Sequence, residues 1–114
     1  MKKFIYKICN AVDWKKFKKK KKFRGSKKDM LDGYIHFSKK NQIKSTLRNN
    51  FLNKKDKLFL LKVDTSNLTN LIWEKSRGGL LFPHLYSSLS LNKVKKVCKI
   101  ILKKNGNHIF PSNF

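Results

Sequence analysis

One segment of this chain constrains its fold more than any other: residues 58–63 read Leu-Phe-Leu-Leu-Lys-Val. The run has the length of a strand, and apolar side chains fall on both of its faces. Such a strand belongs inside a sheet rather than at its edge. Three shorter segments rich in aromatic and β-branched residues, 4–8, 34–37 and 71–73, predict further strands.

Two segments in the N-terminal half have the pattern of amphipathic helices. In the first, Asn10 or Asp13 is a suitable cap, and Trp14 and Phe17 share one helical face. In the second, Ser38 is the expected cap. The expected buried stripe of that second helix consists of Ile43, Leu47 and Phe51.

Residues 94–102 fit a helical period, but their β-branched content favours a strand. Asn105-Gly106 follows, and this dipeptide is a strong hairpin turn before a short apolar segment at 108–110. We therefore predict a strand hairpin here. The expected fold class is α+β, with a mostly antiparallel sheet, two helices in the N-terminal half and a single domain over residues 1–114.

The chain carries 29 Lys and Arg residues against 6 Asp and Glu, a formal net charge of +23. Nucleic-acid binding is one interpretation of this charge, and compositional drift towards lysine is the other. The only arginines are Arg24, Arg48 and Arg77, whereas specific phosphate and base readers usually use arginine forks. The lysine tract at 18–22 is expected to lie in solvent.

Several properties follow from what the sequence does not contain. No apolar run approaches a membrane span, and the basic start at residues 1–7 has no signal-type apolar region behind it, so we expect a cytoplasmic protein without membrane contact. Cys9 and Cys98 lack metal-ligand spacing and are expected to be free thiols, with no metal bound. We expect a monomer.

The candidate site comes from two segments that are poor in lysine, residues 32–38 and 73–86. Both lie at predicted strand ends, and we expect them to face each other. One pocket would then be lined by His36, Ser38, Glu74, Arg77 and His84, with Trp73 packed below as a core residue. Gly78 and Gly79 would let backbone N–H groups reach an anion.

Simpler interpretations exist for the same residues. His36 fits a structural histidine on a short strand, and Glu74 fits a salt bridge to Arg77. No nucleophile signature, P-loop or dinucleotide glycine motif is present.

The same residues carry a family resemblance that covers nearly the whole chain. Its most specific blocks are Trp73-Glu74-x-Ser76-Arg77-Gly78-Gly79 and Phe82-Pro83-His84-Leu85-Tyr86, joined by Asp32-Gly33-Tyr34-Ile35-His36-Phe37-Ser38. On these blocks the chain is identified as a member of the bacterial family called domain of unknown function 952. It departs from the family pattern at Phe37 and Ser87, where Leu and Gly are usual.

That family is similar in layout to the ADP-ribosyltransferase-like fold, in particular to the RNA 2′-phosphotransferases that use NAD. The resemblance implies a split sheet whose cleft holds NAD, with His36 at the ribose, Arg77 at a phosphate and Glu74 beside an oxocarbenium-like centre. Ser38, Gly78, Gly79 and Tyr86 are the further residues expected to bind the dinucleotide, and His84 is the further residue expected to be catalytic. Lys7 stands where those enzymes usually offer His or Arg to the dinucleotide, and it is a point charge rather than a fork.

Two functions therefore remain open from the sequence. The first is an enzyme that transfers an ADP-ribosyl or phosphoryl group and uses NAD. The second is a non-catalytic module that binds a nucleotide or RNA in the same cleft. The positive charge and the lack of a complete catalytic motif favour this second function.

Overall fold

The structure is a computed structural model that describes residues 3–114, and it is built from antiparallel strands and three short α-helices. The α-helices are α1 (Ala11–Lys20), α2 (Lys27–Asp32) and α3 (Ile43–Phe51). The strands are β1 (Phe4–Asn10), β2 (Lys22–Phe23), β3 (Ile35–His36), β4 (Leu58–Asp64), β5 (Leu71–Lys75), β6 (Leu81–Leu85), β7 (Leu89–Ser90), β8 (Val94–Leu102) and β9 (His108–Ile109). Single 3-10 turns are η1 (Lys40–Gln42), η2 (Arg77–Gly79) and η3 (Leu91–Lys93).

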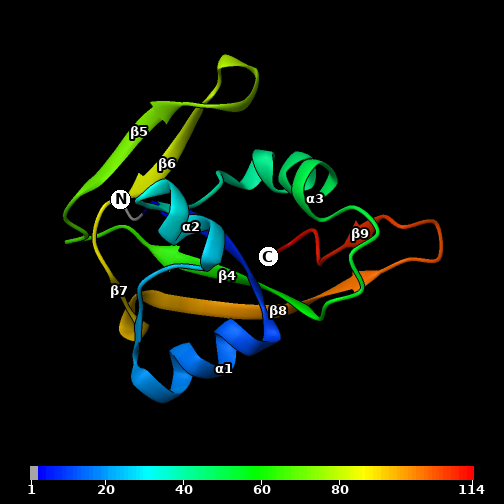
Figure 1. The fold of residues 1–114 in the computed structure, drawn as a ribbon, viewed down its shortest axis with the longest axis horizontal. Helices are drawn as coiled ribbons and strands as arrows, with labels where there is room; N and C mark the ends of the chain where they lie inside the picture. The colour runs from blue at the N-terminus through cyan, green and yellow to red at the C-terminus, as the bar shows by residue number, and fades with distance from the viewer. Residues whose placement is uncertain (1–2) are drawn as a thin grey trace.

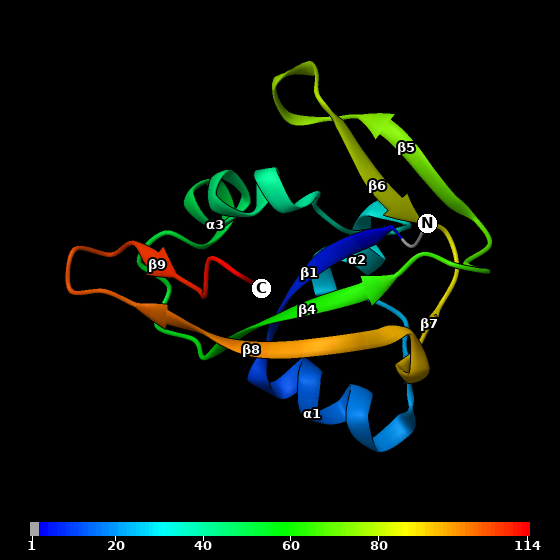
Figure 2. The ribbon, with the colours of Figure 1, turned by 180° about the vertical axis from the view of Figure 1, so that it is seen from behind.

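The strands form three sheets, with the orders β1-β4-β8-β9, β3-β6-β5 and β2-β7. Every pairing between these strands is antiparallel, which confirms the α+β class and the mostly antiparallel sheet. Figures 1 and 2 show the β5–β6 hairpin projecting from one end of the molecule and α1 lying beneath the long strand β8.

Strand β4 lies inside its sheet, as its apolar pattern predicted. Leu58 and Leu60 point into a core with Ile43 and Leu47 of α3, whereas Leu61 and Val63 point into a second core that packs against α1. Both faces of β4 are thus covered, which is why its apolar residues do not alternate with polar ones.

The first helix forms as expected, because the Asn10 side chain accepts from the Asp13 backbone N–H and Trp14 and Phe17 are buried. All five lysines at 18–22 are exposed, as predicted. The strand at 94–102 and its hairpin to β9 are also confirmed.

Three fold predictions were wrong or incomplete. The described residues form a third α-helix, α2, beyond the two helices that were expected in the N-terminal half. The residue that begins the turn before α3 is Lys39, and the Ser38 hydroxyl instead bonds Thr46 Oγ1 at 2.9 Å. Trp73 is 40% exposed rather than core, because it lies on β5, the edge strand of its sheet.

A backbone bridge from β1 joins the β3-β6-β5 sheet to the larger sheet. The backbones of Tyr6 and Ser38 exchange hydrogen bonds of 2.9 and 2.8 Å, so β1 pairs with the segment that follows β3. The Phe37 N–H also donates to the Pro83 carbonyl at 3.0 Å. These backbone contacts fix β3 between the two sheets and so position the residues described next.

Candidate active site

The two lysine-poor segments meet at a pair of histidines. His36 of β3 lies directly opposite His84 of β6 in the antiparallel register. Opposite residues on neighbouring strands project from the same face of a sheet, and the two rings have centroids 5.7 Å apart. The expectation that the segments 32–38 and 73–86 face each other is therefore confirmed.

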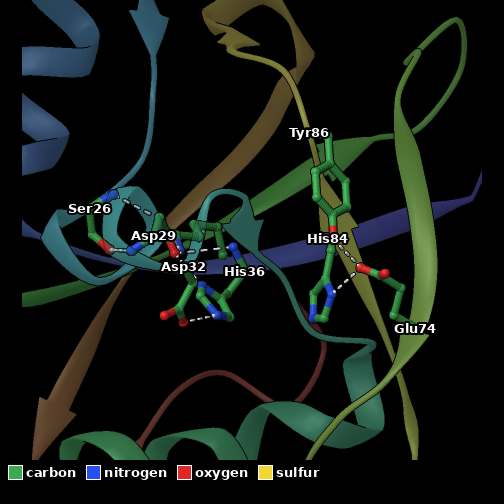
Figure 3. Close-up of polar contacts among 8 residues, drawn as sticks. Ser26, Asp29, Asp32, His36, Glu74, His84 and Tyr86 are labelled. Carbon is green, nitrogen blue, oxygen red and sulfur yellow. Dashed lines mark hydrogen bonds and ion pairs between the residues drawn. The ribbon is translucent and has the colours of Figure 1, made fainter.

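The Asp29 carboxylate, which was not among the predicted site residues, organises one side of this pair (Figure 3). Its Oδ2 atom accepts from Lys7 Nζ and from the Ser26 backbone N–H, each at 2.8 Å. Its Oδ1 atom accepts from the His36 backbone N–H at 3.1 Å and lies 2.6 Å from His36 Nδ1. A carboxylate that is 2% exposed is thus fully hydrogen-bonded, as burial requires.

Local sequence explains how Asp29 reaches this position. Ser26 caps α2, and Asp29 is the third residue of that helix, so the two side chains form a reciprocal capping box. The helix ends at Gly33, whose φ of 86° is accessible to glycine, and the chain turns back into β3. A Ser-x-x-Asp pattern shortly before the motif histidine was the signal that could have identified Asp29.

The charge state of Asp29 follows from its surroundings. Burial alone would raise the pKa of this carboxyl, but the hydrogen bond from His36 and the charge of Lys7 outweigh it and hold the pKa well below its usual range. Lys7 is itself buried and paired with Asp29. Its ammonium is therefore already neutralised inside the protein.

A second carboxylate contacts the other ring nitrogen of His36. Asp32 Oδ2 lies 2.9 Å from His36 Nε2, so the ring is held between Asp29 and Asp32. Both nitrogens can donate at once only in the doubly protonated ring. In this arrangement His36 is a hydrogen-bond donor with a fixed orientation.

His84 has a different environment. Its Nδ1 atom lies 2.8 Å from Glu74 Oε1, and the Tyr86 hydroxyl donates to the same oxygen at 2.6 Å. A carboxylate oxygen can only accept, so Nδ1 carries the hydrogen. Among the described residues no group bonds His84 Nε2, and His84 is 3% exposed.

The same three groups shift one another's ionisation. Hydrogen bonds from Tyr86 and His84 lower the pKa of Glu74, and the hydrogen bond to Glu74 raises the pKa of the Tyr86 hydroxyl to about 12. Glu74 is therefore ionised and Tyr86 neutral at physiological pH.

Tyr34 joins the two histidines into one aromatic group. Its ring stacks on His84 with a centroid distance of 4.1 Å and tilts against His36 at 4.6 Å. The Tyr86 ring lies at 5.2 Å from it. Aromatic packing of this kind restricts the orientation of each ring.

Arg77 belongs to another part of the site. Its Nη2 atom donates to Ser45 Oγ at 3.0 Å and to Thr46 Oγ1 at 3.1 Å, and its guanidinium lies over the Phe82 ring. The expected alternative, a salt bridge from Arg77 to Glu74, is not formed. Arg77 instead ties the tip of the β5–β6 hairpin to α3.

A cleft of about 840 Å³ runs past these groups. Of the predicted site residues, it is lined by Lys7, His36, Ser38, Arg77 and His84. Four others, Glu74, Gly78, Gly79 and Tyr86, do not line it. Glu74 bonds His84 and accepts from Tyr86 outside the cleft lining, and Gly78 and Gly79 are exposed in the turn at the tip of the hairpin, with φ of 68° and 74°.

Charged residues that were not among the predicted site residues also line the cleft. Lys27 and Lys28 of α2 and Lys54 after α3 are exposed and line it. Four carboxylates, Asp13, Asp29, Asp32 and Asp56, line it as well, so the cleft presents both charges and its exposed lysines are available to an anion. An anionic ligand with a polar, hydroxyl-bearing part matches this distribution of charge.

Two absences can be stated for residues 3–114. No group of three or more histidine, cysteine, aspartate or glutamate side chains is arranged to hold a metal ion. No helix in this range has the length and apolar content needed to cross a membrane. Both cysteines are free, as expected.

Fold and site together define a class: a small α+β protein with paired, carboxylate-bound histidines at the wall of a polar cleft. The chain belongs to the family described as "Protein of unknown function (DUF952)", whose pattern matches residues 8–97. This confirms the family to which the sequence motifs pointed. No curated protein sequence matches the chain.

Solved structures of one relative share the fold. The crystal structure of protein CC0527 from Caulobacter crescentus is 36% identical, has a TM-score of 0.87 and covers 94% of both chains. A crystal structure of a double mutant of the same protein gives the same TM-score at 35% identity, again over 94% of both chains. The solution NMR structure of CC0527 is 37% identical with a TM-score of 0.79, covering 91% of this chain and 90% of that one.

Proposed function

We propose that this chain is a group-transfer enzyme that acts on a phosphorylated nucleotide in the cleft, with NAD as its substrate and ADP-ribosyl or phosphoryl transfer as its reaction. One observation carries the proposal. His84 is oriented by Glu74 through Nδ1, while its Nε2 atom has no partner among the described residues and the residue lines the cleft. A histidine held in this way is suited to general acid–base catalysis.

The residues divide into a base and a binding pair. Glu74 fixes the His84 tautomer that leaves Nε2 unprotonated, so Nε2 can take a proton from an acceptor hydroxyl. The Tyr86 hydroxyl adds a second hydrogen bond that orients Glu74. Since Glu74 lies behind His84, its role here is to position the base.

His36 and Asp32 make the binding pair. His36 Nε2 is bonded to Asp32 Oδ2, and Asp32 Oδ1 has no partner among the described residues, so a sugar hydroxyl can donate to Asp32 beside the His36 ring, which suits a ribose. Asp29 holds the other side of the His36 ring and keeps its orientation. This assignment agrees with the ribose contact that the resemblance to ADP-ribosyltransferases implies for His36.

NAD fits the cleft in size and charge. Drug-sized and cofactor-sized ligands occupy pockets of roughly 300–1,000 Å³, and this cleft has about 840 Å³. Arg77 keeps Nε and Nη1 without partners among the described residues, so these atoms and the lysines at the opening would hold its phosphates. Lys7 is less suited, because Asp29 already neutralises it. NAD would supply an ADP-ribosyl group whose bond to nicotinamide is activated by the positive charge of that ring.

The second candidate function is binding of a nucleotide or an RNA end without turnover. The exposed lysines at 27, 28 and 54 favour it, because they line the opening of the cleft and would attract any polyanion. This candidate shares the cleft but gives His84 no chemical role.

A release assay separates the two. The purified protein is incubated with NAD, with and without an RNA carrying a 2′-phosphate, and nicotinamide is quantified by chromatography. The enzyme proposal predicts release that falls by about two orders of magnitude in His84→Gln, as for loss of a general base, and is unchanged in Lys19→Gln on the exposed end of α1. NAD binding without release would favour the binding module. If no nicotinamide is released and neither NAD nor the RNA binds, both candidates are contradicted.

A further inference from the structure

A second, smaller hollow lies away from the cleft, between α3 and the β8–β9 hairpin. It has a volume of about 130 Å³ and is lined by Lys44, Leu47, Arg48, Leu52, Asn107 and His108. None of these residues lines the cleft. No acidic residue lines the hollow, so its polar groups are two cationic side chains, an amide and an imidazole.

His108 is unusual among the described residues. Its Nε2 atom is the one buried side-chain nitrogen or oxygen in residues 3–114 that has no hydrogen-bond partner. Buried polar atoms are nearly always paired, and an unpaired one costs free energy. The backbone holds His108 in this place, because β9 pairs with β8 and His108 lies opposite Leu102.

The two cations of the hollow also lack partners. Lys44 and Arg48 are four residues apart on α3, so they lie on one face of the helix. Neither forms a hydrogen bond or an ion pair with any described residue. Like charges at this spacing destabilise a helix, and an anion between them would remove that repulsion.

The walls of the hollow are fixed to each other. The Asn53 N–H, just beyond α3, donates to the Gly106 carbonyl of the hairpin at 3.2 Å. Gly106 is buried against the Asn53 side chain, and a Cβ atom at this position would overlap it. The hairpin is thus held on α3, and the hollow between them keeps its shape.

We propose that this hollow is a binding site for a phosphate group, held by Lys44 and Arg48, with His108 in its wall. A guanidinium fork and an ammonium are suited to a tetrahedral oxyanion, and Asn107 and His108 of the hairpin close the space opposite them. The volume is about that of four water molecules in the liquid, which is enough for one phosphate. The group comes either from free phosphate or from a nucleic-acid backbone.

The test uses NMR of protein labelled in its histidines, because the chain has only three: His36, His84 and His108. Inorganic phosphate is added at constant ionic strength, and the His108 ring signals should shift with saturation. Arg48→Gln and Lys44→Gln, both at exposed positions, should each weaken this binding by at least about tenfold. The matched control Lys19→Gln removes the same charge elsewhere and should leave it unchanged.

A short single-stranded RNA then distinguishes the sources. If RNA displaces phosphate from the His108 signals, the site takes backbone phosphate. If it does not, the site takes free phosphate. Two results would overturn the proposal: His108 signals that do not move with either probe, as expected if water alone occupies the hollow, or equal weakening in Lys19→Gln and Arg48→Gln.

Discussion

The Lys7 ammonium lies 2.8 Å from the Asp29 carboxylate in the interior of the protein, with side chains only 7% and 2% exposed. This ion pair joins the first strand to α2, and the same carboxylate orients His36. One buried carboxylate therefore couples the stability of the fold to the geometry of the site.

Replacement of Asp29 by Asn should destabilise the protein strongly. The change leaves the buried Lys7 without a counter-charge, and breaking a buried pair on one side typically costs about 3–5 kcal/mol. Urea unfolding of the variant should show this loss. Asp56→Asn, at an exposed carboxylate without a partner among the described residues, is the control and should change the free energy of unfolding little.

The same carboxylate predicts how stability depends on pH. The pKa of Asp29 is lower in the folded protein than its ordinary value of 3.8, so ionised Asp29 stabilises the fold at neutral pH. This contribution should fall as the pH drops below about 4, where the unfolded chain takes up the proton first. Unfolding free energies measured from pH 7 down to pH 3 should decline in the wild type. If the unfolding free energy fell equally with pH in the wild type and in Asp29→Asn, the pH dependence would not come from Asp29.

Tyr86 should report on the ionisation of Glu74. Because the hydrogen bond to Glu74 raises the pKa of Tyr86 to about 12, the phenol signal of this residue should titrate near that pH. Glu74→Gln removes the negative charge and should bring the pKa of Tyr86 back towards about 10. NMR of labelled tyrosine gives the measurement. A Tyr86 titration that is unaffected by Glu74→Gln would show that the two side chains do not interact in solution.

Arg77 is expected to contribute to binding and to stability separately. Arg77→Lys keeps the charge but loses the fork and the paired contacts to Ser45 and Thr46. NAD affinity should fall by about one to two decades, as for loss of one charged hydrogen bond. Calorimetric titration gives the NAD affinity, and thermal unfolding gives the stability, of the wild type and of Arg77→Lys. Reduced stability with unchanged affinity would mean that Arg77 only fastens the hairpin to α3.

The strands of the larger sheet could be predicted because their signals are local. The apolar run of β4 and the Asn105-Gly106 turn before β9 are patterns of neighbouring residues, and both predicted the observed structure. The exposure of Trp73 depended on which strand ends the second sheet, and no pattern within β5 contains that information. Strand order is a tertiary property.

In the candidate site, too, the features with a local sequence signal could be predicted, and those that depend on tertiary packing could not. His36 and His84 stood out as polar residues in lysine-poor segments, and their register brought them together. Asp29 and Lys7 are separated by 22 positions, and their pairing arises only when α2 packs on β1. The partner of Arg77 was assigned to Glu74 from proximity in sequence, whereas folding placed Ser45 and Thr46 of α3 beside it.

The central claim, that the cleft beside the paired histidines is a nucleotide site, is tested most directly by titrating NAD into histidine-labelled protein. If NAD binds in the cleft, the ring signals of His36 and His84 should shift together with one dissociation constant, because both residues line the cleft. His108, outside the cleft, should not follow that curve. His36 and His84 signals that stay in place when NAD is added to the folded protein would contradict a nucleotide site in this cleft.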